Sequence, residues 1–365
     1  MKNGLRFAVL GAGHGGYAMA ADLSLAGYEV NLFNRSPKPI EAIRKRGGIE
    51  ITGEAVYGEG FAKVKATTDM GEAIGDVDII MITVPAFGHE FMIDKSIPHL
   101  KDEQIIVFNT GNFASLRLGH KLRKIGKKNV LAETSILIYS SRITGPTSVF
   151  VDGLKRKLPI AAFPSKKTKE VLEVLGNVYP QLIAATNVLE TSLENLNPIF
   201  HPAITLLNAG LTERTMGNYV FYKDGVGPGV GRTIQAVDDE RTGVAKELGL
   251  RVTSTTEWLY LMYGAKGNNI YEAIQNCKPY LDEGERGPKD FHFRFVTEDV
   301  PYGLVPIASL GDLLGVHTPN IKAIIQLWST INQTDYFKEG YTAKKLGLSG
   351  LTEQEIIKLA TEGSL

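Results

Sequence analysis

Apolar runs alternate with segments of helical period along the first half of the chain. The runs are rich in β-branched residues and predict strands at residues 5–10, 29–33, 77–84, 104–108 and 129–137. Apolar positions at helical spacing predict helices between them, at residues 15–26, 39–46, 70–74 and 114–125. Strands that are apolar on both sides and alternate with helices are typical of a parallel sheet covered on both faces. The pattern therefore predicts an α/β fold with a doubly wound, Rossmann-type sheet.

Two segments interrupt this alternation. Residues 48–67 are punctuated by glycine and alternate between apolar and polar positions, which predicts a hairpin inserted after the second helix. Residues 148–164 have the pattern of two more paired strands, and a helix at 168–178 and an apolar run at 182–188 follow them. We therefore expect the sheet to extend to about residue 188.

The second half of the chain has the pattern of helices. Helical periods cover residues 204–213, 233–247, 255–263, 320–332 and 353–361. Thr191 with Glu194, and Thr352 with Glu355, have the Thr-x-x-Glu spacing of a capping box at a helix start. A length of 365 residues is enough for two cores. We therefore expect a Rossmann-type domain over residues 1–188 and an all-helical, substrate-binding and catalytic domain over residues 189–365.

Composition excludes several classes of protein. Lys and Arg together number 40, and so do Asp and Glu, so the net charge is zero and lacks the basic excess of a nucleic-acid or anionic-membrane binder. A single cysteine, Cys277, provides neither an intrachain disulfide nor a structural zinc site, so we expect no bound metal. No run approaches the roughly 18 apolar residues of a membrane span. A cytoplasmic protein is expected, with a homodimer as the default assembly.

A glycine-rich loop follows the first predicted strand and precedes the first predicted helix. Gly11, Gly13 and Gly16 match G-x-G-x-x-G, and His14 and Gly15 complete the loop. Such a loop permits a tight turn, a close approach of the backbone to a pyrophosphate and close packing of helix on strand. The anion then lies at the helix N-terminus. We expect all five residues to contribute to a dinucleotide site.

The end of the second strand bears on the type of dinucleotide. NAD-selective sites usually place an acidic residue about 20 residues after the glycines, to bind the ribose hydroxyls. Here Asn34 occupies that place, and Arg35, Ser36 and Lys38 follow as donors for a 2′-phosphate. NADP is therefore the predicted cofactor. The alternative is that Arg35 is a solvated surface residue and that NAD also serves.

The ends of two more strands are expected near the nicotinamide half of the cofactor. Val84 and Pro85, with Ala86, end the third main strand, and Asn109 begins the Asn-Thr-Gly-Asn turn that ends the fourth. Ligands of open α/β sheets bind at such carboxyl ends. The alternative is that both segments are ordinary turns that end a strand, since Pro and Asn favour turns.

One of the seven histidines stands out as a candidate acid or base. In a helix, His201 would share a face with Asn197 and Asn208, although Pro202 is expected to kink the helix beside it. Histidine suits proton transfer near neutral pH. A satisfied core histidine is the alternative. His89, His99 and His120 are expected to be solvated or to have packing roles.

A second polar cluster lies at residues 294–306, where Pro and Gly predict an extended loop. Asp299 could orient a catalytic imidazole, and Arg294 could hold a carboxylate with two hydrogen bonds. The alternative is that both residues form ordinary surface ion pairs.

Four motifs resemble the octopine/nopaline (opine) dehydrogenase family, and within it the bacterial enzymes that act on norvaline. They are GAGHGG at residue 11, NLNPIFHP followed by LLNAG from residue 195, TEDVPYGLVP at residue 297 and KLGLSGLT at residue 345. The resemblance covers nearly the whole chain. It implies a Rossmann domain and a helical domain with the active site in a cleft between them.

The resemblance also implies roles for single residues. It assigns His201 as the catalytic histidine, Asp299 as its partner and Arg294 as a substrate-binding arginine. Asn197 and Thr134 are further expected substrate contacts, and Thr134 would line an amino-donor pocket together with Glu133 and Tyr139. The chain departs from the norvaline enzymes at Asn34 and Arg35, where their acidic residue is missing, so their cofactor preference does not transfer.

The resemblance implies reductive condensation of an amino acid with an α-keto acid such as pyruvate, by NAD(P)H, to a secondary amine dicarboxylate. An alternative is an NADP-dependent reductase of a simple carbonyl, similar to ketopantoate reductase or glycerol-3-phosphate dehydrogenase. A third possibility is a nucleotide-responsive binding protein without catalysis, which would leave His201, Arg294 and Asp299 without a role.

Overall fold

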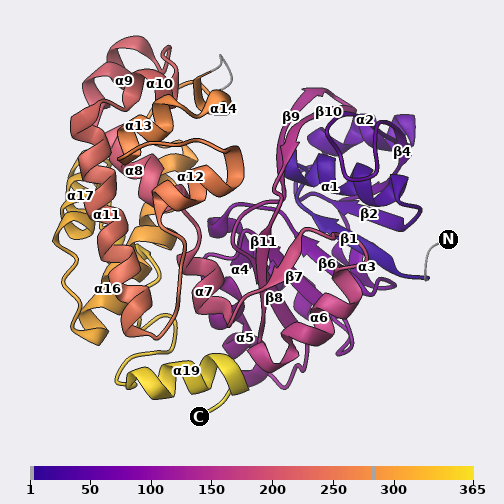
Figure 1. Ribbon diagram of the computed structural model, residues 1–365. Helices are drawn as coiled ribbons and strands as arrows, with labels where there is room; N and C mark the ends of the chain where they lie inside the picture. The colour runs from indigo at the N-terminus through magenta and orange to yellow at the C-terminus, as the bar shows by residue number, and fades with distance from the viewer. Residues whose placement is uncertain (1–3, 282–284) are drawn as a thin grey trace. The chain divides into compact units, whose positions relative to one another are not determined.

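The chain divides into two compact units. A computed structural model describes residues 4–281 and 285–365. The first unit contains the residues up to Thr191 together with Lys358–Leu365, and the second contains Ser192–Ile357 (Figure 1).

An eight-stranded sheet forms the centre of the first unit, in the order β12-β11-β8-β7-β6-β1-β2-β5. All neighbours are parallel except β8 and β11, and the order of the first six strands from β5 to β8 is that of a doubly wound dinucleotide-binding sheet. The strands are β1 (Arg6–Leu10), β2 (Glu29–Phe33), β5 (Lys65–Thr67), β6 (Ile79–Ile82), β7 (Ile105–Asn109), β8 (Val130–Thr134), β11 (Leu158–Phe163) and β12 (Leu182–Ala184).

Helices cover both faces of this sheet because its strands are apolar on both sides. In β1, Phe7 and Val9 join one core cluster with residues of α1, whereas Ala8 and Leu10 join a second with residues of α3, α4 and α5. The helices of this unit are α1 (His14–Leu25), α2 (Lys38–Arg46), α3 (Met70–Ile74), α4 (Ala86–Ser96), η1 (Ile97–His99), α5 (Ala114–Lys124), η2 (Ser165–Lys167), α6 (Thr168–Leu175) and most of α7 (Val188–Leu193). The sequence did not predict α4, because its apolar side chains form no stripe at helical period.

A second, four-stranded sheet has the order β4-β3-β10-β9. The predicted hairpin is confirmed as β3 (Gly48–Gly53) and β4 (Gly60–Lys63). The predicted pairing within residues 148–164 is wrong: β10 (Ser148–Leu154) pairs with β3 and with β9 (Tyr139–Gly145), whereas β11 pairs with β8 in the large sheet. Buried and exposed residues alternate over most of β10, which suits a sheet with one exposed face, whereas β11 is almost wholly buried.

Helices form all the regular structure of the second unit in its described residues, apart from an isolated bridge between Val220 and Arg286. The longest, α11, packs against α8, α13, α16 and α17 (Figure 1). The helices are α8 (Asn197–Leu207), α9 (Ala209–Thr215), α10 (Phe221–Gly225), α11 (Pro228–Glu247), α12 (Thr255–Tyr263), α13 (Ile270–Gln275), α14 (Lys278–Leu281), α15 (Arg294–Thr297), η3 (Val300–Leu304), α16 (Val305–Leu314), α17 (Pro319–Ile331) and α18 (Tyr336–Glu339). The predicted fold class is therefore confirmed.

Only one of the two predicted capping boxes forms. At the start of α19 (Glu353–Glu362), the Thr352 amide donates to the Glu355 carboxylate and the Glu355 amide donates to Thr352 Oγ1. Thr191 instead lies inside α7, whose first amides bond to the side chain of Asn187. The predicted box at Thr191 and Glu194 is wrong because the helix begins one turn earlier.

The segment 294–306 is helical rather than an extended loop, so that prediction is also wrong. It consists of α15, the π-helical turn η3 and the start of α16. Pro301 and Pro306 each stand in the first turn of a helical segment, where the missing N–H would have no intrahelical partner. Pro202 lies inside α8 without ending it. In the described part of the chain, no helix is long and apolar enough to cross a membrane.

Candidate active site

The glycine loop connects β1 to α1, and close packing requires glycine at both Gly11 and Gly16. Gly11 has a φ of +120°, and a Cβ there would lie 2.7 Å from Val84 Cγ1. Its amide donates to the Phe33 carbonyl at 2.9 Å. A Cβ at Gly16 would lie 1.7 Å from the Gly11 carbonyl oxygen. These glycines therefore bring helix α1 directly against the end of β1.

Gly13 and Gly15 differ from each other in their surroundings. Gly13 is exposed, and a Cβ there would meet no atom within 4 Å. It also precedes the first turn of α1, which has no side-chain cap. A Cβ at Gly15 would instead lie 2.4 Å from Leu137 Cδ2, so this glycine is needed for packing within the protein. The open space over Gly13 and the uncapped helix start fit the phosphates of a dinucleotide.

His14 ties the loop to the second sheet. Its Nδ1 accepts a hydrogen bond from the Ile143 amide at 2.8 Å. Because Nδ1 is the acceptor, the proton of the neutral ring lies on Nε2. His14 is exposed beside Gly13 at the start of α1.

The end of β2 supports the loop and presents cationic and polar groups. Asn34 Oδ1 accepts from the Ala12 amide at 3.1 Å, and its Nδ2 donates to the Ser36 carbonyl at 2.9 Å. Arg35 and Ser36 are exposed, and the Arg35 guanidinium lies 5.3 Å from the centre of the Phe91 ring. Asn34 thus shapes the loop, while Arg35 is held beside an aromatic ring at the surface.

The segment after β6 begins α4. Val84 packs against Gly11, and Pro85 occupies the N-cap of the helix. The Val84 carbonyl accepts a hydrogen bond from His89 Nε2 at 3.1 Å. Burial lowers the pKa of His89 to about 3, so its ring is neutral. The predicted structural role of His89 agrees with these contacts.

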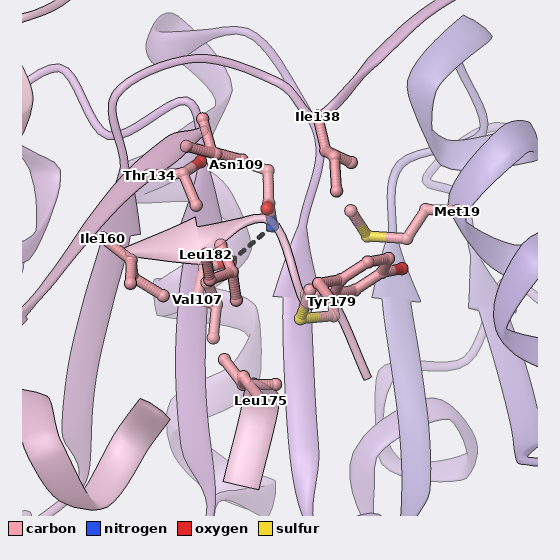
Figure 2. Close-up of a pocket in the computed structure, with 11 residues that line it drawn as sticks. Met19, Val107, Asn109, Thr134, Ile138, Ile160, Leu175, Tyr179 and Leu182 are labelled. Carbon is pink, nitrogen blue, oxygen red and sulfur yellow. Dashed lines mark hydrogen bonds between the residues drawn. The ribbon is translucent and has the colours of Figure 1, made fainter. Parts of the chain in front are cut away.

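Asn109 and Thr134 are neighbours at the ends of β7 and β8. Both line a small cavity of about 10 Å³ whose other walls are largely apolar (Figure 2). Asn109 Nδ2 donates to the Val107 carbonyl at 3.2 Å, and Thr134 Oγ1 donates to the Ile136 carbonyl at 2.9 Å (Figure 2 shows the Asn109 bond). The cavity has room for about one water molecule and is too small for an amino acid.

Glu133 and Tyr139, predicted to line the amino-donor pocket with Thr134, are buried in the first unit. Glu133 accepts hydrogen bonds from the Ser115 amide and the Thr191 hydroxyl. The Tyr139 hydroxyl donates to Asp22 at 2.7 Å. These bonds hold both side chains within the protein, so the structure gives Tyr139 no place in a substrate pocket.

A histidine and a carboxylate form a buried pair in the second unit. His201 lies in the middle of α8 and Asp299 lies just before η3, with exposures of 4% and 2%. Nδ1 of His201 is 2.8 Å from Oδ2 of Asp299. The Phe295 ring stacks on the imidazole, with 3.9 Å between ring centres. The pair predicted from the sequence is therefore brought together, and its geometry is fixed by packing.

Burial opposes charge on both members of this pair. Burial, with a smaller contribution from the positive charge of Arg294, lowers the pKa of His201 to about 3. Burial also raises the pKa of Asp299 to about 7, and Arg294 acts against this increase. At neutral pH the imidazole is therefore uncharged, and the Asp299 carboxyl is poised to gain or lose a proton.

Arg294 begins α15 and is the cation beside the pair. Its side chain is 48% exposed, and its Nε lies 3.8 Å from Oε2 of the buried Glu298, one helical turn along the chain. A half-exposed guanidinium that also influences the titration of His201 and Asp299 can receive an anionic ligand close to them.

The two asparagines of the predicted polar stripe have different surroundings. Asn197 is half-buried at the first turn of α8, one turn before His201. Asn208 follows the helix and donates to the carbonyls of Ile204 and Gly225. Asn208 therefore secures the end of α8 to α10.

Tyr222 was missed by the sequence reasoning. Its hydroxyl lies 3.1 Å from His201 Nε2, the nitrogen that does not face Asp299. It belongs to α10, 21 residues after His201. No spacing in the sequence links the two residues, because packing of α10 against α8 brings them together.

Comparisons with known proteins bear on the family of the chain. Residues 184–332 match the family profile described as NAD/NADP octopine/nopaline dehydrogenase, alpha-helical domain, and residues 7–164 match that of ketopantoate reductase PanE/ApbA. The chain is 38% identical to the opine dehydrogenase of Arthrobacter sp. strain 1C over 95% of this chain and 96% of that protein. It is also 25% identical to Protein ocs of Agrobacterium vitis over 97% of this chain and 98% of the relative.

Solved structures share the fold. One is octopine dehydrogenase with NADH and L-arginine, with a TM-score of 0.78, 21% identity and 98% coverage of both chains. Another is yersinopine dehydrogenase with NADP⁺, with a TM-score of 0.70, 15% identity and 99% coverage of both chains. The resemblance found in the motifs is thereby confirmed, and the chain belongs to the opine dehydrogenase family of NAD(P)-dependent oxidoreductases that act on CH–NH bonds.

Proposed function

We propose that this protein is an opine dehydrogenase that condenses the α-amine of an amino acid with a pyruvate-like α-keto acid and reduces the product to a secondary amine dicarboxylate. The observation that carries the proposal is the buried His201–Asp299 pair with Arg294 beside it. The 38% identical relative is an opine dehydrogenase, and octopine dehydrogenase has been solved with NADH and pyruvate as well as with L-arginine.

The buried pair supplies the proton that this chemistry requires. The amine first adds to the keto carbon, giving a carbinolamine. Loss of its hydroxyl as water forms the C=N bond and needs one proton on the departing oxygen. His201 and Asp299 provide this proton in reduction and take it back in the reverse direction. Since the imidazole is neutral, Asp299 fixes its tautomer and stores the proton.

We assign the substrate carboxylate to Arg294, because a guanidinium binds carboxylate with two parallel hydrogen bonds. Asn197, one turn from His201, is a second proposed substrate contact. Thr134 stays a proposed contact at the end of β8, although its hydroxyl donates to backbone carbonyls in this structure. Each assignment can be tested separately, by substituting the residue and measuring the KM of each substrate.

The dinucleotide is proposed to bind at the glycine loop, with Gly11, Gly13, Gly15, Gly16 and His14 at its phosphates. Asn34, Arg35 and Ser36 would hold its adenosine half, and Val84, Pro85 and Asn109 its nicotinamide half. When bound, a reduced nicotinamide supplies the hydride for the C=N bond. NADP is the proposed preference because Asn34 stands where NAD-selective sites have an acid and the exposed Arg35 follows it. Structures of the family hold NADH and NADP⁺.

A homodimer working in the cytoplasm is the proposed state of the protein, and it rests on the general prevalence of symmetric dimers. Light scattering on the purified protein measures the assembly directly.

The test of function is a screen of NADPH and NADH oxidation with α-keto acids, each with and without a panel of amino acids. We expect oxidation only when both substrates are present and a secondary amine dicarboxylate as the product, detected by mass spectrometry. His201→Gln is the matched control and should lack turnover while retaining dinucleotide binding. Absence of condensation across the panel would refute the proposal.

A simple carbonyl reductase is the second candidate, favoured by the match of residues 7–164 to the ketopantoate reductase family. The same screen separates the two, because this alternative predicts oxidation that does not depend on an amino acid.

A further inference from the structure

Both ring nitrogens of His201 are already hydrogen-bonded within the second unit. Nδ1 faces Asp299 at 2.8 Å, and Nε2 faces the Tyr222 hydroxyl at 3.1 Å. One face of the ring is covered by Phe295, and an edge-to-face contact with Phe221 adds a further wall. A substrate therefore finds neither nitrogen exposed. It must either displace the Tyr222 hydroxyl or exchange protons through it.

The Tyr222 ring is held in place by other aromatic rings. It stacks on Tyr280 with 3.9 Å between centres and an interplanar angle of 8°. Phe221 and Phe200 contact it edge to face, at 5.0 and 6.0 Å. Rotating the ring away from His201 would break this stack. Mediation by a fixed hydroxyl is thus favoured over displacement.

The groups around the hydroxyl keep it protonated. Burial raises the pKa of Tyr222 well above its usual range, and negative charge on Glu285, Tyr263 and Asp299 would raise it further. Tyr280, whose ring stacks on that of Tyr222, acts on this pKa in the opposite direction. A phenol that resists ionisation can still pass a proton if it gains one at its oxygen as it gives one up.

We propose that the Tyr222 hydroxyl is the catalytic group through which His201 exchanges protons with the substrate, a role that rests on the proposed condensation reaction. In imine formation, the phenol proton goes to the carbinolamine oxygen as its C–O bond breaks and water leaves. The Nε2 proton moves to the phenol oxygen, and the Asp299 carboxyl proton moves to Nδ1. The nitrogen lone pair forms the C=N bond, giving an iminium ion opposite the Asp299 carboxylate.

This scheme keeps both the imidazole and the phenol neutral before and after the step. Each of them gains one proton as it loses another, and His201 changes only its tautomer. The step instead creates a negative charge on Asp299 and a positive charge on the iminium ion. Such a relay agrees with the low proton affinity of the buried imidazole, which would make a free imidazolium an unfavourable intermediate.

The test compares Tyr222→Phe with Tyr219→Phe, which removes another buried hydroxyl, one bonded to Thr212 Oγ1 at 2.9 Å. We expect Tyr222→Phe to lower kcat about 100-fold or more, as loss of an acid–base group does, and Tyr219→Phe to leave it within about twofold. An unchanged or increased kcat in Tyr222→Phe would overturn the relay, since removing a displaceable hydroxyl should help the substrate reach Nε2.

A second measurement does not depend on turnover. In protein labelled with ¹⁵N-histidine, with His201 assigned through His201→Gln, the Nε2 resonance should shift in Tyr222→Phe and stay in place in Tyr219→Phe. An Nε2 resonance that ignores Tyr222 would overturn the contact on which the relay depends. Should Tyr222→Phe fail to fold, 3-fluorotyrosine at position 222 keeps the shape and changes the acidity of the phenol, and an unaltered rate would count against the relay.

Failure of the relay and failure of the proposed function give different results. If the wild-type protein condenses substrates and Tyr222→Phe does so equally well, the relay is wrong and the function stands. If the wild-type protein condenses no pair of substrates, the condensation is wrong and the relay falls with it, whatever the resonance shows of the His201–Tyr222 contact.

Discussion

His201 Nδ1 and Asp299 Oδ2 are 2.8 Å apart in an environment that excludes nearly all solvent. The carboxylate and the imidazole are both costly to charge there, so the pair holds its proton more readily on oxygen than an isolated aspartate and histidine would in water. Activity should therefore depend on the charge and the shape of position 299 separately.

Asp299→Asn keeps the shape of the side chain and removes the titratable proton. Its amide can only offer a fixed oxygen or nitrogen to Nδ1, so it can hold the ring but cannot store a proton. We expect kcat to fall about 100-fold or more, with little change in the KM of either substrate. Steady-state kinetics of both directions measure this.

Asp312→Asn provides the control, since Asp312 is a surface carboxylate of the same unit paired with Lys322. It should retain full activity. Comparable losses of kcat in the two variants would show that any loss of a carboxylate from this unit lowers activity, and that the His201–Asp299 pair has no special role.

The pH dependence follows from the raised pKa of Asp299. Reduction consumes a proton, and Asp299 holds one below its pKa of about 7. In the reductive direction kcat/KM should therefore fall as pH rises through about 7, approaching tenfold per pH unit, and in the oxidative direction it should rise over the same range. The pH profile of kcat/KM for Asp299→Asn, measured with the same substrates, should lack this inflection. The inflection caused by the substrate amine should remain. A profile shared by the wild type and the variant would contradict the assignment.

Arg35 is expected to decide between the two dinucleotides. Arg35→Asp would replace a donor for the 2′-phosphate by a repelling charge. The KM for NADPH should rise about 10-fold to 100-fold, while that for NADH changes little or improves. Lys45→Asp makes the same charge change at an exposed position of α2 and should leave both values unaltered. Equal efficiency of the wild type with NADH and NADPH would refute the NADP preference but not the assignment to the family.

Gly13 and Gly16 separate binding from folding within one loop. Gly13→Ala puts a methyl group into open space, so thermal stability should be preserved while dinucleotide affinity falls at least about tenfold. Gly16→Ala puts a methyl group 1.7 Å from the Gly11 carbonyl oxygen and should destabilise the protein by about 1–3 kcal/mol. Thermal melts and fluorescence titration with NADPH measure the two effects. A Gly16→Ala protein as stable as the wild type would show that the loop can shift to accommodate the methyl group, and would contradict this prediction.

The sequence predicts best where one local rule decides the structure. Buried strands and the glycine loop were predictable because apolar runs and a fixed spacing encode them. His201 and Asp299 were predictable through motifs, although the sequence placed Asp299 in an extended loop. Pro301 and Pro306 suggested that loop, but prolines also suit the first turn of a helix.

What the sequence could not provide are contacts made by tertiary packing. Tyr222 reaches His201 only after α10 packs on α8, and Arg35 meets Phe91 only after α4 packs beside the sheet. The pairing of β10 with β3 links segments about one hundred residues apart, which no local pattern specifies.

The C-terminal residues have a consequence for how the protein is made. Lys358–Leu365 belong to the first unit, where the Gly363 carbonyl accepts a hydrogen bond from Arg123 and Glu362 pairs with Lys166. The second unit is thus an insertion in the covalent chain of the first. On the ribosome, the nucleotide-binding sheet must wait for the entire helical unit to emerge before its last contacts can form. A nascent chain that ends near residue 191 would therefore contain every strand described for this unit but lack its last helix.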